Sequence, residues 1–189
     1  MPFTLSLSIA CNEFNSNPFA LSLSKGARAV DNPSRFHHMT VRTRAPTPTM
    51  ECTVHWMPST GMGFAAETGS GHFLTMDGAP DGGGRNLAPR PMETLLAGAG
   101  GCTAYDVVLI LKRGRHAVSG CQVRLQAERA AQDPKVFTKI HLHFVVTGKA
   151  VPAAAVERAI AMSHEKYCSA TIMLGRTAEV TTSFEVVEG

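Results

Sequence analysis

The sequence predicts one α+β domain in which helices pack against antiparallel sheets. Three observations support this fold class. Residues 51–77 hold three short segments of strand-forming residues separated by turn-prone stretches. A long run of small and apolar residues from Pro91 to about Arg113 has the length and composition of a helix. Two segments of alternating apolar and polar residues follow it, and the resulting order βββαββααβ is typical of the α+β class.

The 189 residues divide into two regions by composition. Residues 1–50 show little periodicity and contain the turn-rich stretches NSNPF, DNPSR and RAPTPT. We expect a disordered extension here, because this composition buries too little apolar surface to offset the entropy of ordering. Two interpretations stay open for this extension: the natural start of the protein lies at Met39 or Met50, or the extension is a genuine but flexible tail. Residues 51–189 form the one well-buried domain that this length allows.

The first half of this domain is expected to be a β-meander followed by a long helix. Its strands correspond to the segments ECTVHWM, GFAAETG and GHFLTMD, and a loop rich in Gly and Pro, residues 77–90, follows them. Pro91 suits the first helical position, and Glu93 places a carboxylate near the positive end of the helix. Gly114 is expected to end the helix.

The second half begins with two strands joined by a hairpin at AAQDPKV. Their expected inward-facing residues alternate along the chain: Cys121, Val123, Leu125 and Ala127, then Ile140, Leu142, Phe144 and Val146. Pro152 opens a second helical region, which continues through or breaks near Tyr167. A last alternating segment, residues 178–187, predicts the final strand.

Composition argues against several classes of function. The net charge is only +3 and the basic residues are scattered, so we expect no nucleic-acid partner. The apolar run Thr94 to Tyr105 is shorter than the roughly 20 residues that span a bilayer, so no membrane partner is expected. Five cysteines without an export signal indicate the reducing cytoplasm.

Cys102 and Cys168 are the best indication of chemistry, because each lies beside small residues in a helix-like segment. In a reducing compartment, a thiol pair favours redox chemistry or metal binding over a structural disulfide. A reactive thiolate needs a nearby cation, which Arg85, Arg90 or Lys166 would have to supply. The alternative for Cys102 is a small apolar residue that only packs, since free cysteine is often buried.

The glycines that precede Cys102, in the stretch AGAGG, each cost a helix about 1 kcal/mol relative to alanine. Close approach of another backbone is the usual compensation, because a helix face without side chains permits it. Such a face, together with the open edges of the meander, leads us to expect a homodimer.

The histidines raise a second hypothesis, a zinc site. His72 and His164 complete a Cys2His2 set with the two cysteines, but no C-x-x-C or H-x-x-x-H spacing supports it, so we expect no metal and no other cofactor. His141 and His143 share one strand face and are expected to form a solvated polar surface. The remaining cysteines of the domain, Cys52 and Cys121, lie in strand patterns and are expected to be inert packing residues.

Three stretches carry a resemblance to a known family. PMETLLAGAGGCTAYDVVLILKRGR, FTKIHLHFVVTG and SHEKYCSATIML resemble the OsmC/Ohr family, most closely its YhfA-type subgroup. The resemblance implies an intertwined homodimer in which sheets from both chains clasp two central helices, with two sites at the interface. It also implies reduction of hydroperoxides, preferably organic ones, in oxidative stress defence. Cys102 would attack the peroxide, Cys168 would resolve the sulfenic acid, and a dithiol would reduce the disulfide.

Two positions depart from the peroxidase pattern. The family glutamate directly follows a proline ten residues before the first cysteine, whereas Met92 follows Pro91 here and Glu93 is the nearest candidate for that catalytic carboxylate. The family arginine lies in the early strands, but residues 51–77 contain no arginine. The sequence therefore leaves two functions open: a thiol-dependent hydroperoxide reductase, or a non-catalytic protein that binds a small apolar or thiol-bearing ligand.

Overall fold

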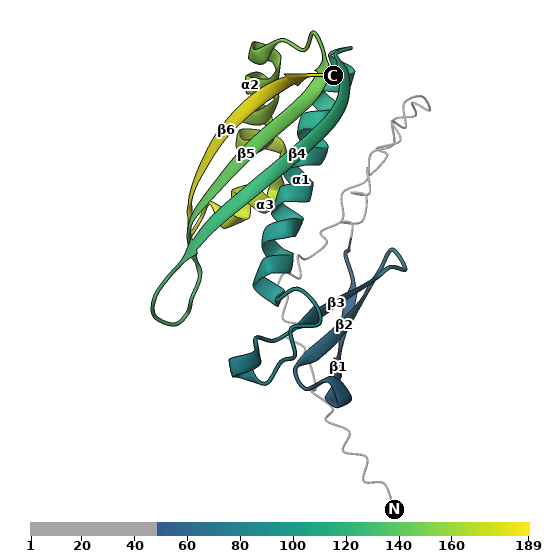
Figure 1. Ribbon diagram of the computed structural model, residues 1–189, viewed down its shortest axis with the longest axis vertical. Coiled ribbons are helices and arrows are strands. Elements are labelled where there is room, and N and C mark those ends of the chain that lie inside the picture. The colour runs from purple at the N-terminus through teal and green to yellow at the C-terminus, as the bar shows by residue number, and fades with distance from the viewer. Residues whose placement is uncertain (1–48) are drawn as a thin grey trace, which may run out of the picture. The chain divides into compact units, whose positions relative to one another are not determined.

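The computed structural model describes residues 49–189 (Figure 1). These residues belong to one compact unit, Pro48–Gly189. The expectation of a disordered extension over residues 1–50 therefore lies almost entirely outside the described residues. Within them, the order of strands and helices is the one predicted from the sequence, with short 3-10 turns and one π-helical turn added.

The first sheet is the expected meander. Its strands β1 (Cys52–Met57), β2 (Gly63–Thr68) and β3 (Phe73–Asp77) are antiparallel and lie in chain order. A 3-10 turn, Pro58–Thr60, follows β1, and a tight turn at Gly71, where φ is 79°, precedes β3. Glycine suits this left-handed backbone because it has no Cβ.

The helix α1 runs over Pro91–Arg113, as predicted. Pro91 occupies the first turn, and the Glu93 Oε2 atom accepts a hydrogen bond of 2.9 Å from the backbone N–H of Arg90. The carboxylate thus satisfies a backbone donor at the positive end of the helix. Gly114 ends the helix, with its N–H donating to the Ile110 carbonyl.

Much of the apolar surface of α1 is not covered by its own chain. By length and composition alone, α1 is long and apolar enough to cross a membrane. The core helix of a soluble protein meets the same two criteria. Only 28% of its most apolar stretch is buried within the described residues. The apolar run expected from the sequence, Thr94 to Tyr105, was too short, because Asp106 interrupts the apolar residues of α1 without ending them.

The second sheet has the order β4-β5-β6, with β4 (Ala117–Arg129), β5 (Phe137–Lys149) and β6 (Glu179–Glu188). The strands β4 and β5 form the predicted hairpin, but β6 pairs with β5 in parallel. The expectation of purely antiparallel sheets is wrong here. A crossover of α2 (Ala153–Met162), a π-helical turn (Ser163–Tyr167) and α3 (Ser169–Leu174) returns the chain, as parallel neighbours require.

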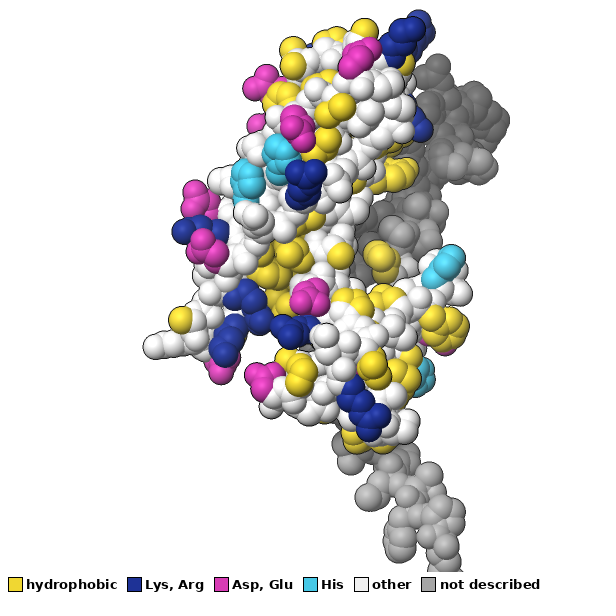
Figure 2. All heavy atoms as spheres, viewed as in Figure 1, with side chains coloured by type: hydrophobic (Ala, Val, Ile, Leu, Met, Phe, Trp, Pro, Cys, Tyr) yellow, Lys and Arg dark blue, Asp and Glu magenta, His cyan; other side chains and the backbone are white. Residues whose placement is uncertain are grey.

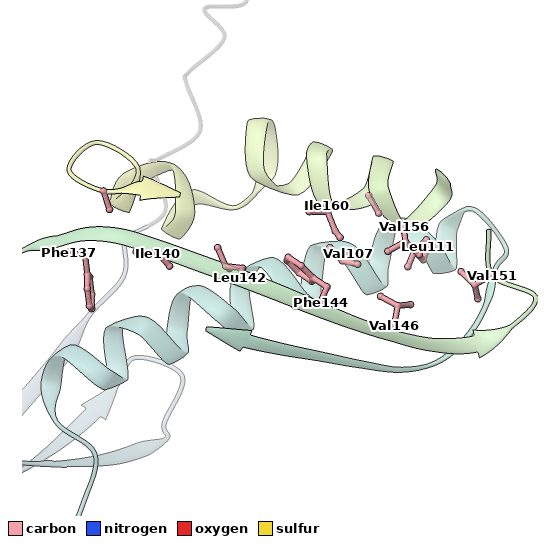
Figure 3. Packing of buried hydrophobic residues seen from close by; sticks show 12 residues of the cluster. Val107, Leu111, Phe137, Ile140, Leu142, Phe144, Val146, Val151, Val156 and Ile160 are labelled. Carbon is pink, nitrogen blue, oxygen red and sulfur yellow. The ribbon is translucent and has the colours of Figure 1, made fainter. Parts of the chain in front are cut away.

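The core lies between this second sheet and the helices, with α1 against β4 and α2 against β6 (Figure 1). Side chains from β5 point toward α1 and α2 (Figure 3). The labelled members are Phe137, Ile140, Leu142, Phe144 and Val146 of β5, Val107 and Leu111 of α1, Val151, and Val156 and Ile160 of α2. The alternation predicted for β5 is confirmed, and this core fixes α1 and the crossover against each other.

Candidate functional site

The structure brings Cys102 and Cys168 together. Cys102 lies in the middle of α1, and Cys168 directly precedes α3. Their sulfur atoms and a carboxylate oxygen of Asp106 all lie within 4.8 Å of one another. Cys102 is half-buried, whereas Cys168 is fully buried. A peroxide or other small molecule therefore has better access to the Cys102 thiol.

A π-helical turn presents Cys168 to α1. The backbone N–H of Cys168 donates to the Ser163 carbonyl at 2.8 Å, five residues earlier, which is the π-helical pattern. Cys168 then leaves the helical conformation and caps α3, where the Thr171 N–H donates to its sulfur at 3.5 Å. The break after α2 therefore positions both Ser163 and Cys168 toward α1, and such π-helical turns are frequent at functional sites.

The environment of Cys168 favours its neutral form. Burial raises the pKa of the Cys168 thiol above the ordinary thiol value, and the neighbouring Cys102 side chain raises it further. Hydrogen bonds from the side chain and backbone of Thr171 act in the opposite direction and lower this pKa. Because the thiolate is the nucleophile, Cys168 is the poorer candidate for first attack on a peroxide.

A buried polar network supports the third member of the site, Asp106. The Ser163 hydroxyl donates to Asp106 Oδ2 at 3.0 Å and lies 2.9 Å from the Thr103 hydroxyl. Thr103 and Ser163 are both buried. The sequence places Asp106 four residues after Cys102, on the same face of the helix, where its charge would oppose ionisation of the thiol, but it did not indicate a catalytic or ligand role for this carboxylate.

Glu93 does not join the thiols within its own chain. Nine residues separate it from Cys102, which corresponds to about 13 Å along the helix axis. Its carboxylate is exposed and bonds the helix start at Arg90. In this chain the Glu93 carboxylate therefore acts as a helix cap.

None of the three candidate cations bonds to either sulfur within residues 49–189. The Arg85 charge acts on the buried Asp77 carboxylate, whose pKa it helps to lower, and the Arg85 backbone N–H donates to the same carboxylate at 3.0 Å. The Lys166 ammonium lies 5.4 Å from the centre of the Tyr167 ring. The third, Arg90, lines a separate cavity near the start of α1.

That cavity has a volume of about 420 Å³ and lies where the start of α1 meets the base of the β4–β5 hairpin. Its walls combine apolar residues with a few charged ones: Asp77, Gly78, Ala79, Arg90, Pro91, Met92, Glu93, Leu96, Ala127, Arg129 and Phe137. In the space-filling view, Lys and Arg side chains gather beside an apolar hollow in this region (Figure 2). The cavity has room for a small ligand.

The remaining candidates lie outside the thiol site. His72 contacts Ser70 at 3.3 Å, and neither His72 nor His164 belongs to the donor group around the two cysteines. The described residues therefore do not assemble the Cys2His2 set that was raised as a second hypothesis. Cys121 packs against the core, as expected, but Cys52 is exposed on β1. The expectation for Cys52 failed because strand alternation does not reveal which sheet face is covered.

His141 and His143 face the solvent side of β5, as the alternation predicted, but they are hydrogen-bonded rather than free. The Ser183 hydroxyl of β6 lies 2.9 Å from a ring nitrogen of each histidine. Thr181 binds the other nitrogen of His141 at 2.8 Å. This polar chain stabilises the parallel pairing of β5 and β6.

The fold and the paired thiols define a class: an α+β protein whose long small-residue helix carries one cysteine opposite a second, buried one. Comparison with known proteins agrees. Residues 82–183 match the family model described as OsmC-like protein. The chain is 47% identical over 138 residues to protein YhfA of Escherichia coli K12, covering 73% of this chain and 98% of YhfA. The chain belongs to the OsmC-like family.

Solved structures share the fold. A hypothetical protein from Aquifex aeolicus VF5 is 28% identical with a TM-score of 0.66, covering 76% of this chain and 99% of that one. A Legionella pneumophila protein described as an organic hydroperoxide resistance protein is 19% identical with a TM-score of 0.57, covering 75% and 99%. At 19% identity, the likeness to the Legionella pneumophila protein concerns the fold alone.

Proposed function

We propose that this protein reduces organic hydroperoxides by a two-cysteine mechanism, as part of oxidative stress defence in the cytoplasm. The observation that carries the proposal is the meeting of a half-buried and a fully buried thiol from distant parts of the chain. The name of the Legionella relative, an organic hydroperoxide resistance protein, is consistent with this chemistry.

In the proposed reaction, the Cys102 sulfur attacks the terminal peroxide oxygen and the O–O bond breaks. The products are a sulfenic acid on Cys102 and an alcohol. Asp106, whose carboxylate lies within 4.8 Å of the sulfur, accepts the thiol proton through a bridging water and returns it to the departing alkoxide. Cys168 then attacks the sulfenic acid, forming a disulfide and releasing water. A dithiol reductant restores both thiols and is itself oxidised.

The short distance between the sulfurs suits the second step. A disulfide requires a sulfur separation of about 2.05 Å, so rotation of the two side chains and a small local movement would close the gap. The elevated pKa of Cys168 and its burial protect this thiol from direct oxidation until Cys102 has reacted.

We also propose that the active form is a homodimer, because apolar surface of α1 remains uncovered in one chain. A groove of about 420 Å³ runs along this helix and is lined by Gly101, Ala104, Tyr105, Val108, Leu109, Lys112 and Cys121. Tyr105 is 69% exposed and Leu95 is 47% exposed. A second chain on this face would bury these side chains and bring further charged groups toward Cys102.

The test measures hydroperoxide consumption with a dithiol in excess. The parent protein should consume cumene hydroperoxide over many turnovers, Cys102→Ser should not, and Cys168→Ser should accumulate a sulfenic acid on Cys102 that a dimedone label detects. Cys52→Ser is the matched control, because Cys52 is exposed on β1 and lies outside the donor group. Turnover by Cys102→Ser at the parent rate would contradict the proposal.

A second function is a small-ligand-binding protein without turnover. The cavity at the start of α1 favours it, since this cavity pairs apolar walls with Arg90 and Arg129 and suits an apolar carboxylate. Isothermal titration with a medium-chain fatty acid tests this function. Saturable binding that Arg129→Ala weakens, with no peroxide turnover by the parent, would select the binding function over the reductase.

A further inference from the structure

The side chain beside the two thiols is a carboxylate, and this combination points to a metal. Sequence reasoning considered histidines as the additional ligands, but the structure brings Asp106 to Cys102 and Cys168 instead. We propose that the three residues bind a thiophilic divalent cation of the Zn²⁺ type. The inference does not depend on peroxide turnover.

The spacing of the donor atoms suits tetrahedral coordination. With Zn–S bonds near 2.3 Å and Zn–O bonds of 2.0–2.2 Å, the ligand atoms of a tetrahedral site lie roughly 3.5–3.8 Å apart. The three donor atoms here all lie within 4.8 Å of one another. Small side-chain rotations therefore suffice to place all three around one ion.

The carboxylate is also held as a metal ligand would be. Ser163 donates to Asp106 Oδ2, and Ser163 is in turn hydrogen-bonded to Thr103, so a buried pair of hydroxyls fixes the orientation of the carboxylate. No other hydrogen bond or ion pair involves the Asp106 side chain within residues 49–189, which leaves Oδ1 for an ion. Hydrogen bonds of this kind to ligating carboxylates are a regular feature of metal sites.

The backbone around Cys168 completes this support. The Thr171 N–H points at the Cys168 sulfur at 3.5 Å, and the Thr171 hydroxyl donates to the Cys168 carbonyl at 3.2 Å. The sulfur is therefore held in place by the first turn of α3. An N–H donor beside a sulfur compensates part of the negative charge of a metal-bound thiolate.

The donor set selects the class of ion. Two sulfurs and one oxygen favour Zn²⁺ and similar thiophilic cations, whereas Mg²⁺ and Ca²⁺ prefer oxygen ligands alone. Three protein ligands leave a fourth position for water or a small molecule, which is the pattern of an open zinc site. Because the cation holds both sulfurs as thiolates, metal binding and formation of the Cys102 to Cys168 disulfide exclude each other.

The experiment uses Co²⁺ as a spectroscopic probe of the full-length protein, reduced with a phosphine and freed of metal. We expect one Co²⁺ per chain, a thiolate-to-cobalt charge-transfer band in the near ultraviolet, tetrahedral bands in the visible, and displacement by Zn²⁺. Cys102→Ser and Cys168→Ser should each weaken the charge-transfer band and the affinity. Asp106→Asn should lower the affinity by at least about 10-fold, since even outer partners of metal ligands contribute 10–100-fold.

Two further variants keep the test decisive. Ser163→Ala retains all three ligands and removes only the hydrogen bond to Asp106, so it should weaken binding by less than Asp106→Asn. Cys52→Ser, whose thiol is exposed and lies outside the donor group, should bind Co²⁺ as the parent does. Circular dichroism verifies that each variant is folded.

The inference is overturned if the parent shows no charge-transfer band with excess Co²⁺, or if Asp106→Asn binds as tightly as the parent. A protein that binds Co²⁺ in this way but never consumes peroxide would support the metal site and refute the reductase. Peroxide turnover without Co²⁺ binding would support the reductase and refute the metal site. The two proposals therefore fail separately.

Discussion

Gly101 on α1 tests the proposed dimer through a single methyl group. A Cβ built at Gly101 meets nothing within 4 Å in its own chain. If this helix face were bare in solution, Gly101→Ala would raise helix propensity and stabilise the protein by about 0.5–1 kcal/mol. If the proposed second chain covers this face, we expect the substitution to destabilise the protein instead, because glycines on a long helix allow another backbone to approach closely.

An added methyl in a packed contact costs about 1–3 kcal/mol. Subtracting the gain in helix propensity leaves a net loss of about 0–2.5 kcal/mol per chain, and the symmetry of a dimer applies it twice. Since 1 kcal/mol shifts the midpoint of a chain of this size by about 2–4 °C, a net loss near the middle of this range, about 1 kcal/mol per chain, is measurable by calorimetry. We therefore expect Gly101→Ala to lower the thermal midpoint and to weaken the dimer.

The measurement combines calorimetry with light scattering over a range of protein concentrations. Gly100→Ala is the comparator, because its Cβ would lie 2.7 Å from Leu125 Cδ1 of the same chain and so perturbs packing with or without a dimer. If Gly101→Ala raises the midpoint and both proteins scatter as single chains, this face of α1 is bare and the dimer proposal fails.

Four further outcomes follow from the structure. Gly148→Ala should destabilise the protein by about 1–3 kcal/mol or more, because the new Cβ would meet the Ala117 carbonyl and the Val151 side chain; Gly82→Ala, where a Cβ meets nothing within 4 Å, is the control in the same calorimetric assay. Backbone N–H groups of Leu87, Arg85 and Gly78 lower the pKa of Asp77, so its contribution to stability is present above the ordinary value of 3.8 and is lost as the pH falls through the lower, folded-state pKa. Asp77→Asn should remove this acid dependence from a series of thermal midpoints, and an unchanged series would contradict the assignment. Burial raises the pKa of Cys168 above 9.0, so its contribution is complete below pH 9.0 and declines as the pH rises toward the folded-state pKa; Cys168→Ala should flatten the alkaline arm of the same series. Deleting residues 1–49 should leave the midpoint within about 2 °C, because their composition predicts no core; a larger fall would show that they pack against the domain.

Local patterns were sufficient to predict the elements of the domain. The bounds of α1 followed from Pro91, Glu93 and Gly114, because helix ends are determined by residues within a turn of the end. The inward face of β5 followed from alternation alone, because side chains on a strand point to opposite faces in turn. The two thiols could be singled out in the same way, since each lies in a recognisable run of small residues.

The parallel pairing of β6 and the exposure of Cys52 depended on how the elements pack together. The Ser163 and Asp106 side chains are 57 positions apart and meet only because the crossover lies against α1. Local periodicity tells which face of a strand or helix is apolar, but not which distant element covers it or in which direction a returning strand runs. The sequence by itself therefore determined the elements and the two cysteines, whereas the tertiary structure decided the carboxylate and hydroxyls that surround them, because those contacts exist only after long-range packing is complete.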